Sequence, residues 1–314
     1  MFSDPTTASG LPESAFANTK SEARIKSTAF GSTLMEPSSA NWRNRAVSGC
    51  QSRVAQSNCD GCLLDMLTMG IYSKNYVKAL PAKPGAGRDY TQTEWRSGLI
   101  TVEQAFQSQL PSRVIVGNMV SNAYRFWRAP ITSQPIVAAS QGAQMEDFLR
   151  GAADPVGKFP TASEWLDNVN TIKRIESMGL AGLYSTKLWS GATAAEVKHW
   201  DAYAMASFLT QANGYSYLAF TPARSQAGAT GLLNPYTMPT TLGNPTGTMA
   251  LDHQLYKRTF ANGLVLVNPG VTRITVPLTT QGRDLDAVTR TQVSLAPQSG
   301  TVLVRAGPGV LDLD

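Results

Sequence analysis

The stretch Asp60-Gly61-Cys62-Leu63-Leu64-Asp65 decides the fold class of this 314-residue chain. An apolar run of this length between turn signals is typical of a strand buried on both faces of a parallel α/β sheet. Because side chains alternate along a strand, Leu63 and Asp65 share one face, and Cys62 and Leu64 share the other. Catalytic groups of β/α barrels lie at the carboxyl ends of the strands, so Asp65 is a candidate catalytic residue. The alternative is that Asp65 caps the helix or turn that follows it.

Strand-like runs alternate with helices up to about residue 220. The runs cover residues 31–36, 60–65, 113–118, 142–146, 180–187 and 214–220, and the helices between them cover 38–57, 91–109, 163–178 and 193–212. Thr91 and Ser163 are the expected N-caps of two of these helices. The alternation predicts parallel strands in chain order, as in a (β/α)8-type barrel of α/β class. Residues 1–30 are weakly patterned, so the barrel lacks its first strands and is open, or is closed by residues 1–30 or a second copy.

The sequence changes character towards its C-terminal end. Residues 226–250 are rich in Pro, Gly, Thr and Asn, as in a linker or long loop. Short β-like runs follow at residues 255–260, 263–268, 273–278, 292–295 and 301–305, and turn signals such as Asn262-Gly263 separate most of them. Short strands with no helix between them predict a small antiparallel β-sandwich. The chain therefore divides into a weakly patterned segment (1–30), a partial barrel (31–225), a linker or loop (226–250) and the β-sandwich (251–314).

Composition and charge exclude several classes of protein. A hydrophobic content of 42% and a charged content of 16% suit a folded globular chain. The 27 basic residues are scattered and the net charge is only +5, so no nucleic-acid partner is expected. No apolar stretch reaches membrane-spanning length, so no membrane partner is expected either. The first residues show no signal peptide, and a secreted protein would need one ahead of a longer natural chain. The cellular location stays open.

Three cysteines lie close together in the sequence, at Cys50, Cys59 and Cys62. Cys59-x-x-Cys62 has the spacing of a redox pair or half a zinc site, but no second cysteine pair or nearby histidine completes it. Cys62 lies in the apolar run, where we expect a buried thiol that packs as a small hydrophobic side chain. A Cys50–Cys59 disulfide stays open if the protein is exported. With His199 and His253 as its two histidines and no nucleotide-binding fingerprint, the chain is expected to use no metal and no cofactor.

Three motifs resemble a family of hypothetical glycoside hydrolases. They are Asp60-Gly-Cys-Leu-Leu-Asp65, Met145-Glu146-x-Phe148, and a tail from Arg258-x-Phe260-x-Asn-Gly-Leu-Val-Leu-Val-Asn-Pro269 to Ala296-Pro-x-Ser-Gly300-x-Val-Leu. The resemblance covers Leu34 to Val304 and implies a TIM barrel followed by a small C-terminal β-sandwich. It also implies that Asp65 ends barrel strand four and Glu146 ends strand six. In related barrel glycosidases these positions hold the nucleophile and the acid/base. The family should have two further strands before Gly31, which residues 1–30 cannot supply.

Glycoside hydrolysis needs two carboxyl groups, one protonated and one ionised. We expect Asp65 and Glu146 to face one cleft with their carboxyl groups roughly 5–10 Å apart. Glu146 is the candidate acid, because Met145 and Phe148 flank it and apolar neighbours raise a carboxyl pKa. Asp65 is the candidate nucleophile or base. The alternative for Glu146 is a helix-start acid that binds backbone amides, and Glu36 is expected to serve a turn.

Other polar and aromatic side chains near the strand ends are candidates for substrate binding. Asn118 and Lys187 are candidate partners of sugar hydroxyls, and Trp127, Trp189 and Tyr217 are candidate stacking surfaces, with plain packing as the alternative for the aromatics. The sequence therefore predicts a glycoside hydrolase that cleaves O-glycosidic bonds of a poly- or oligosaccharide. A non-catalytic carbohydrate-binding barrel, or an inactive fragment of such an enzyme, is the alternative. Unpaired strand edges of an open barrel also favour self-association.

Overall fold

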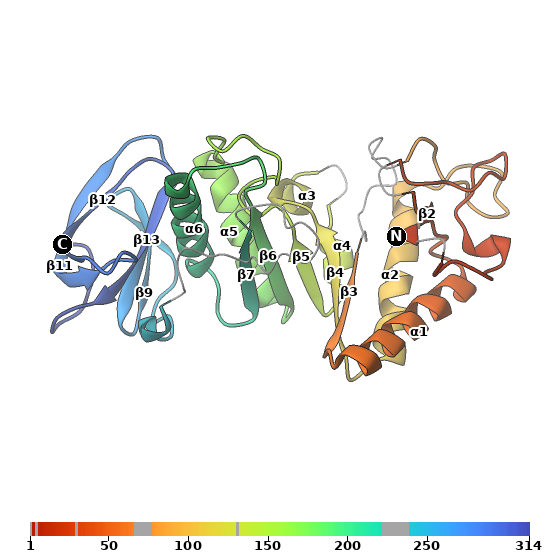
Figure 1. Ribbon diagram of the computed structural model, residues 1–314, viewed down its shortest axis with the longest axis horizontal. Coiled ribbons are helices and arrows are strands. Elements are labelled where there is room, and N and C mark those ends of the chain that lie inside the picture. Colours follow the sequence, from red (N-terminus) through yellow and green to blue (C-terminus); the bar gives the residue numbers. More distant parts are fainter. Residues whose placement is uncertain (1, 4–5, 29–30, 66–76, 130–131, 222–238) are drawn as a thin grey trace. The chain divides into compact units, whose positions relative to one another are not determined.

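The computed structural model forms two compact units (Figure 1). It describes residues 2–3, 6–28, 31–65, 77–129, 132–221 and 239–314. The first unit comprises residues 1–121 and 125–144, and the second comprises residues 122–124 and 145–314. No helix in these described ranges is long and apolar enough to cross a membrane.

The N-terminal part of the first unit is a small antiparallel arrangement. Strand β1 (Phe2–Ser3) pairs with β2 (Thr33–Leu34), and the short helix η1 (Glu13–Ala15) lies between them in the chain. The prediction that residues 31–36 form a parallel barrel strand is therefore wrong. Such a short strand takes its direction from distant packing, here a core that includes Phe16, Met35 and Trp42.

Two long helices follow in the first unit, α1 (Ala40–Ser57) and α2 (Gln92–Gln109). The buried stripe of α1 is the expected one and consists of Trp42, Val47, Cys50 and Val54. Helix α2 begins at the expected cap, because Thr91 and Glu94 form a capping box that satisfies two backbone N–H groups. A disulfide joins Cys50 of α1 to Cys62. Cys62 is thus not a free thiol, and the Cys50–Cys59 pairing is wrong, since Cys59 is free and exposed.

The parallel strands of the first unit are β3 (Gly61–Leu64), β4 (Val114–Val120) and β5 (Gly142–Met145), in chain order across the sheet. Strand β4 was predicted to end at Asn118, and it continues for two more residues. Leu63 is 50% exposed, so the prediction that β3 is buried on both faces is wrong. Two short helices, α3 (Ala123–Trp127) and α4 (Gln134–Val137), lie in the stretch after β4.

The second unit continues the strand–helix alternation with α5 (Ala162–Ser177), β6 (Ala181–Lys187), α6 (Ala194–Leu209) and β7 (Ser216–Thr221). Strands β6 and β7 are parallel, as predicted. Both helices start with a capping box, at Thr161 and at Thr193. Ser163 is therefore not the cap of α5, because the Thr161-Ala-Ser-Glu164 box begins two residues earlier. The described residues contain five parallel strands in all.

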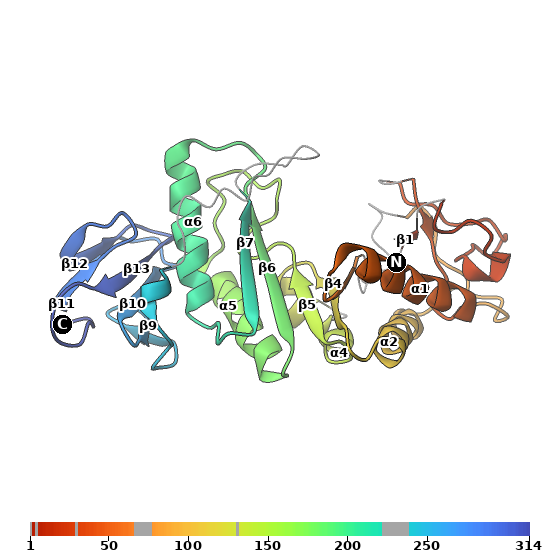
Figure 2. The same cartoon turned by 60° about the horizontal axis from the view of Figure 1, so that its bottom comes forward.

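The C-terminal region is the antiparallel β domain that the turn signals predicted (Figure 2). After η2 (Thr240–Leu242), its strands are β8 (Ala250–Asp252), β9 (Leu255–Phe260), β10 (Gly263–Asn268), β11 (Ile274–Arg283), β12 (Thr289–Leu295) and β13 (Ser299–Arg305). They form a six-stranded sheet in the order β12-β11-β13-β10-β9-β8. The register of β11 shifts between Pro277 and Gly282, and leucines and valines from both halves of the sheet share one core.

Helix α6 joins the two parts of the second unit, because it packs between β7 and the strands β10 and β13 (Figure 2). Gly300 makes this approach close: a Cβ atom there would lie 2.6 Å from the Cβ of Ala206. The four-part division at residues 30, 225 and 250 stays a prediction, and most of its linker, residues 226–238, lies outside the described residues.

Candidate functional site

Asp65 lies at the carboxyl end of β3 beside a buried amide. Leu64 is opposite Gly117 in the β3–β4 ladder, so the next residues, Asp65 and Asn118, are side by side. The Nδ2 atom of Asn118 donates a 2.8 Å hydrogen bond to Oδ1 of Asp65. Asn118 is buried while Asp65 is exposed. A fixed donor thus holds one oxygen of a carboxylate whose side chain still reaches solvent.

Glu146 lies at the carboxyl end of β5 beside a cation. It directly follows Met145, and its Oε1 atom is 3.2 Å from Nζ of Lys187, the last residue of β6. The Glu146 side chain is 41% exposed, whereas that of Lys187 is only 13% exposed. The same Nζ lies 5.1 Å from the ring centroid of Trp189, in cation–π contact. The structure therefore brings together three predicted site residues, Glu146, Lys187 and Trp189.

The turn that carries Glu146 is tied to β6 through its backbone. The Ser185 hydroxyl donates to the carbonyl of Glu146 at 2.9 Å, and the Phe148 N–H donates to the carbonyl of Ser185 at 3.0 Å. Leu149 has a φ of 68°, a strained conformation for a leucine. Its N–H donates to Oδ1 of the buried Asn168 at 2.9 Å. These bonds fix the position of the acidic turn.

Asp147 is a further acid in this turn, and it was not among the predicted site residues. Burial raises its pKa to about 6, the neighbouring Glu146 and Asp154 carboxylates act in the same direction, and Lys187 and the Ala152 N–H oppose the shift. The signal in the sequence was its place next to Phe148, which is fully buried. A carboxyl group with this pKa exchanges a proton in the range where a glycosidase acid works.

The two remaining predicted residues, Tyr217 and Trp127, lie on β7 and α3. Tyr217 is opposite Leu183 near the start of β7, roughly 13 Å along the ladder from Lys187, and is 64% exposed. Trp127 ends α3 with its ring edge-on to Phe126 at 4.9 Å between centroids. Tyr217 therefore lies outside the group formed by Glu146, Lys187 and Trp189.

Glu36 serves a turn, as expected. Its Oε1 atom accepts from the Ser38 N–H at 3.0 Å and from the Tyr90 hydroxyl at 2.6 Å. Burial, followed by the bond to Glu36, raises the pKa of Tyr90 well above its usual range. Among the described residues, no group of three or more His, Cys, Asp or Glu side chains is arranged to hold a metal ion.

Comparison with known proteins gives a family match. Residues 12–264 match hypothetical glycosyl hydrolase family 15. No curated protein matches the chain.

Solved structures similar to the chain include Amy13B of Eubacterium rectale (11% identity, TM-score 0.49) and the maltogenic α-amylase AmyB of Thermotoga neapolitana (11% identity, TM-score 0.49). A pullulanase of Anoxybacillus sp. LM18-11, complexed with maltotriose, is 9% identical with a TM-score of 0.49. The matches cover 90%, 95% and 93% of this chain, and 66%, 71% and 49% of those chains, respectively. The chain thus spans less than two thirds of the length of the Eubacterium rectale protein.

Proposed function

Because the chain belongs to hypothetical glycosyl hydrolase family 15, we propose that it hydrolyses O-glycosidic bonds of a poly- or oligosaccharide with Asp65 and Glu146. One observation carries this proposal: each acid is the first residue after a parallel strand, Asp65 after β3 and Glu146 after β5. The carboxyl ends of parallel strands are where β/α enzymes hold their catalytic groups. The separation of roughly 5–10 Å expected for the two carboxyl groups stays a prediction.

Asp65 is the proposed nucleophile or base. A nucleophile or base must be ionised and correctly aimed. The bond from Asn118 Nδ2 occupies Oδ1 of Asp65 and so orients the carboxylate. Because an amide is neutral, it fixes the direction of the carboxylate without neutralising its charge.

Glu146 is the proposed proton donor to the leaving oxygen. Lys187 holds its carboxylate at 3.2 Å, and Asp147, with a pKa raised to about 6, is the next residue in the same fixed turn. Protonation of Asp147 therefore becomes favourable in mildly acidic solution. We expect hydrolysis to be fastest on the acidic side of neutrality. Trp189, which already contacts the Lys187 ammonium, is the proposed stacking surface for a sugar ring.

The test is a reducing-sugar assay over a panel of neutral and acidic polysaccharides. Wild-type protein is compared with Asp65→Asn and Glu146→Gln, and each variant is checked for an unchanged far-UV circular dichroism spectrum. Asp60→Asn is the matched control, because Asp60 is an exposed acid at the opposite end of β3. We expect both site variants to lose most turnover and the control to keep it. Full activity in a folded site variant would reject that acid as catalytic.

A carbohydrate-binding domain without turnover is the second candidate. The observation that favours it is the pairing of Glu146 with Lys187 beside Trp189, because a carboxylate, an ammonium and an aromatic ring can bind a sugar without transferring a proton. In that case the protein binds oligosaccharides in calorimetry and releases no reducing ends at any pH from 4 to 8. The two candidates therefore separate in one pair of measurements.

A further inference from the structure

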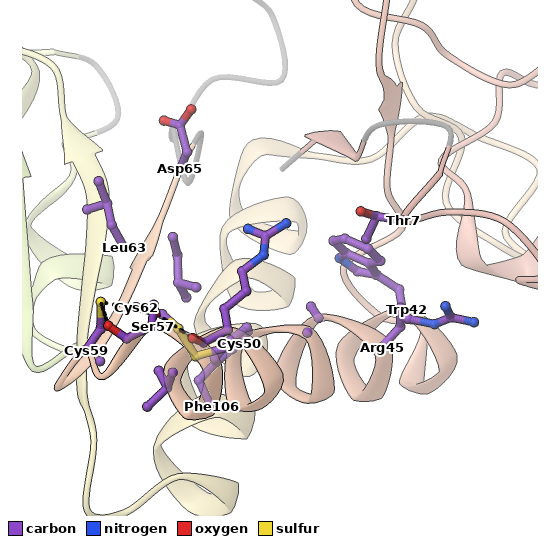
Figure 3. Close-up of a pocket in the computed structure, with 16 residues that line it drawn as sticks. Thr7, Trp42, Arg45, Cys50, Ser57, Cys59, Cys62, Leu63, Asp65 and Phe106 are labelled. Carbon is purple, nitrogen blue, oxygen red and sulfur yellow. Dashed lines mark hydrogen bonds between the residues drawn. A yellow bond between two sulfur atoms is a disulfide. The ribbon is translucent and has the colours of Figure 1, made fainter. Parts of the chain in front are cut away.

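A cavity of about 450 Å³ lies inside the first unit, between helix α1 and strand β3 (Figure 3). Its volume is in the range of small-molecule sites. Asp65 is at one end of the cavity, and Trp42 and Thr7 are at the other. Its lining includes the disulfide between Cys50 and Cys62, which ties α1 to β3 and fixes the width of the cavity.

The wall formed by α1 presents two arginines with a gap between them. Arg45, Gly49 and Arg53 all line the cavity and, at a spacing of four residues, lie on one face of the helix. A Cβ atom added at Gly49 would meet no atom within 4 Å, so the glycine leaves open space at this point. A glycine inside a helix costs about 1 kcal/mol relative to alanine, and here the cost leaves room between two cations.

The arginines are available to a ligand. The Arg45 guanidinium makes a long bond of 3.4 Å to the carbonyl of Ser9. Arg53 is exposed, and within the described residues its guanidinium has no ion-pair partner. Of the other residues in the lining, only Asp65 carries a full negative charge, so the cavity has a net positive charge.

Trp42 supplies an independent sign of a ligand. Its side chain lines the cavity and the residue is only 5% exposed, yet its Nε1 atom has no acceptor among the described residues. A buried N–H without an acceptor costs free energy, about 1–3 kcal/mol, unless something else accepts from it. The cavity thus offers hydrogen-bond donors at Trp42 and Arg53, and it calls for a ligand rich in acceptor oxygens.

We propose that this cavity binds a sugar residue that bears a carboxylate, so that the natural substrate is an acidic saccharide. The sugar carboxylate pairs with Arg53, a ring or hydroxyl oxygen accepts from Trp42 Nε1, and the sugar lies within the cavity that ends at Asp65. This inference rests on the proposed function only where it calls the bound saccharide a substrate; the binding itself does not require turnover. A neutral sugar would leave the arginines without a charged partner, whereas guanidinium and carboxylate form paired, charge-assisted hydrogen bonds.

The experiment is calorimetric titration of the full chain with tri-D-galacturonate and with neutral tri-D-galactose, in 50 mM and 300 mM salt. We expect the uronate to bind at least about tenfold more tightly than the neutral trisaccharide, and to lose affinity at the higher salt concentration. Arg53→Gln should abolish that preference. Arg113→Gln is the matched control, because Arg113 is an exposed arginine of the same unit outside the lining of the cavity, and it should keep the preference.

A second variant tests the open space at Gly49 instead of the charge of the arginines. Gly49→Leu fills the open position on α1, and it should weaken binding of both trisaccharides, whereas Gly49→Ala should have a smaller effect. Equal affinity for the two trisaccharides, no binding of either, or equal loss in Arg53→Gln and Arg113→Gln would overturn the proposal. Uronate binding without hydrolysis would contradict the proposed hydrolase activity and support the proposed binding site. Hydrolysis of neutral polysaccharides without uronate binding would support the hydrolase activity and contradict the binding site.

Discussion

The carboxyl ends of β3 and β5 carry the same kind of residue in different surroundings. Asp65 accepts a hydrogen bond from the neutral amide of Asn118, whereas Glu146 pairs with the ammonium of Lys187. The bond from Asn118 therefore orients the Asp65 carboxylate. Glu146 is part of a charged group in which Asp147 also takes part. Position at a strand end selects the candidate acids, and the neighbouring side chains decide what each acid can do.

A similar contrast separates two carboxyl groups whose pKa is raised by burial, Glu103 in the first unit and Asp147 in the second. Glu103 in α2 is fully buried, neither of its oxygens has a hydrogen-bond partner in the described residues, and burial raises its pKa to about 8. Burial also raises the pKa of Asp147, but only to about 6, because Lys187 and the Ala152 N–H stabilise the charge. An acid with a cation and an amide nearby is therefore easier to ionise than a buried acid without such partners.

The largest expected effect on catalysis separates the two acids of the β5 turn. Glu146→Gln removes the proposed proton donor and should lower kcat about 100-fold or more. Asp147→Asn keeps Glu146 and Lys187 in place and should keep kcat within about tenfold of wild type. The check is kcat from pH 4 to 8 for both variants on the polysaccharide that wild type cleaves best. The reverse order of effects would make Asp147 the proton donor and Glu146 its neighbour.

The pH dependence of the free energy of unfolding tests the raised pKa of Glu103. The pKa of Glu103 in the folded protein, about 8, lies above the 4.5 of an unperturbed glutamate, so its stabilisation is fully present below pH 4.5 and is lost as the pH rises through 8. The loss should reach about 4 kcal/mol by pH 9. Glu103→Gln should remove this dependence, as measured by urea unfolding at pH 5 and pH 9. Glu22→Gln changes an exposed glutamate of the same unit and should leave the dependence unchanged.

The contribution of Asp147 to the free energy of unfolding should also fall as the pH rises, but by less than that of Glu103. The pKa of Asp147 in the folded protein, about 6, lies above the 3.8 of an unperturbed aspartate, so its stabilisation is present below pH 3.8 and is lost as the pH rises through 6. Because solvent screens this half-buried group, we expect a loss of about 2 kcal/mol. Asp147→Asn should remove it. In Lys187→Met the pKa of Asp147, followed by NMR, should rise above 6; an unchanged value would mean that Lys187 does not act on Asp147.

The regular elements were predictable because local patterns specify them. The T-x-x-E box at Thr91, the stripe of α1 and the turn signals of the C-terminal sheet each depend on neighbours within a few residues. The Thr161 box was equally readable and was overlooked in favour of Ser163. The direction of β2 was not readable, because its partner β1 lies about thirty residues earlier in the chain.

The site was predictable in part for the same reason. The strand pattern of the sequence predicts that Asp65 and Glu146 each follow a strand. It does not predict that Asp65 and Asn118 are neighbours, because this depends on the register between β3 and β4. The raised pKa of Asp147 depends on a loop amide at Ala152 and on Lys187, forty residues away in the chain. Cysteine spacing cannot decide connectivity, so the Cys50–Cys62 disulfide needed the structure.

The smallest expected effect tests whether a neutral amide is enough to direct Asp65. Asn118→Ala removes the 2.8 Å bond and should lower kcat about tenfold, equivalent to about 1.4 kcal/mol, the scale of one hydrogen bond. The Michaelis constant should change little, because the bond orients the carboxylate and does not hold the sugar. Asn44→Ala, an exposed asparagine on α1, is the control and should change neither constant. Asn118→Asp should be worse than alanine, because a second carboxylate beside Asp65 raises the pKa of the pair. If alanine and aspartate variants both match wild type, the amide does not direct Asp65, and the contrast between the two strand ends is one of packing alone.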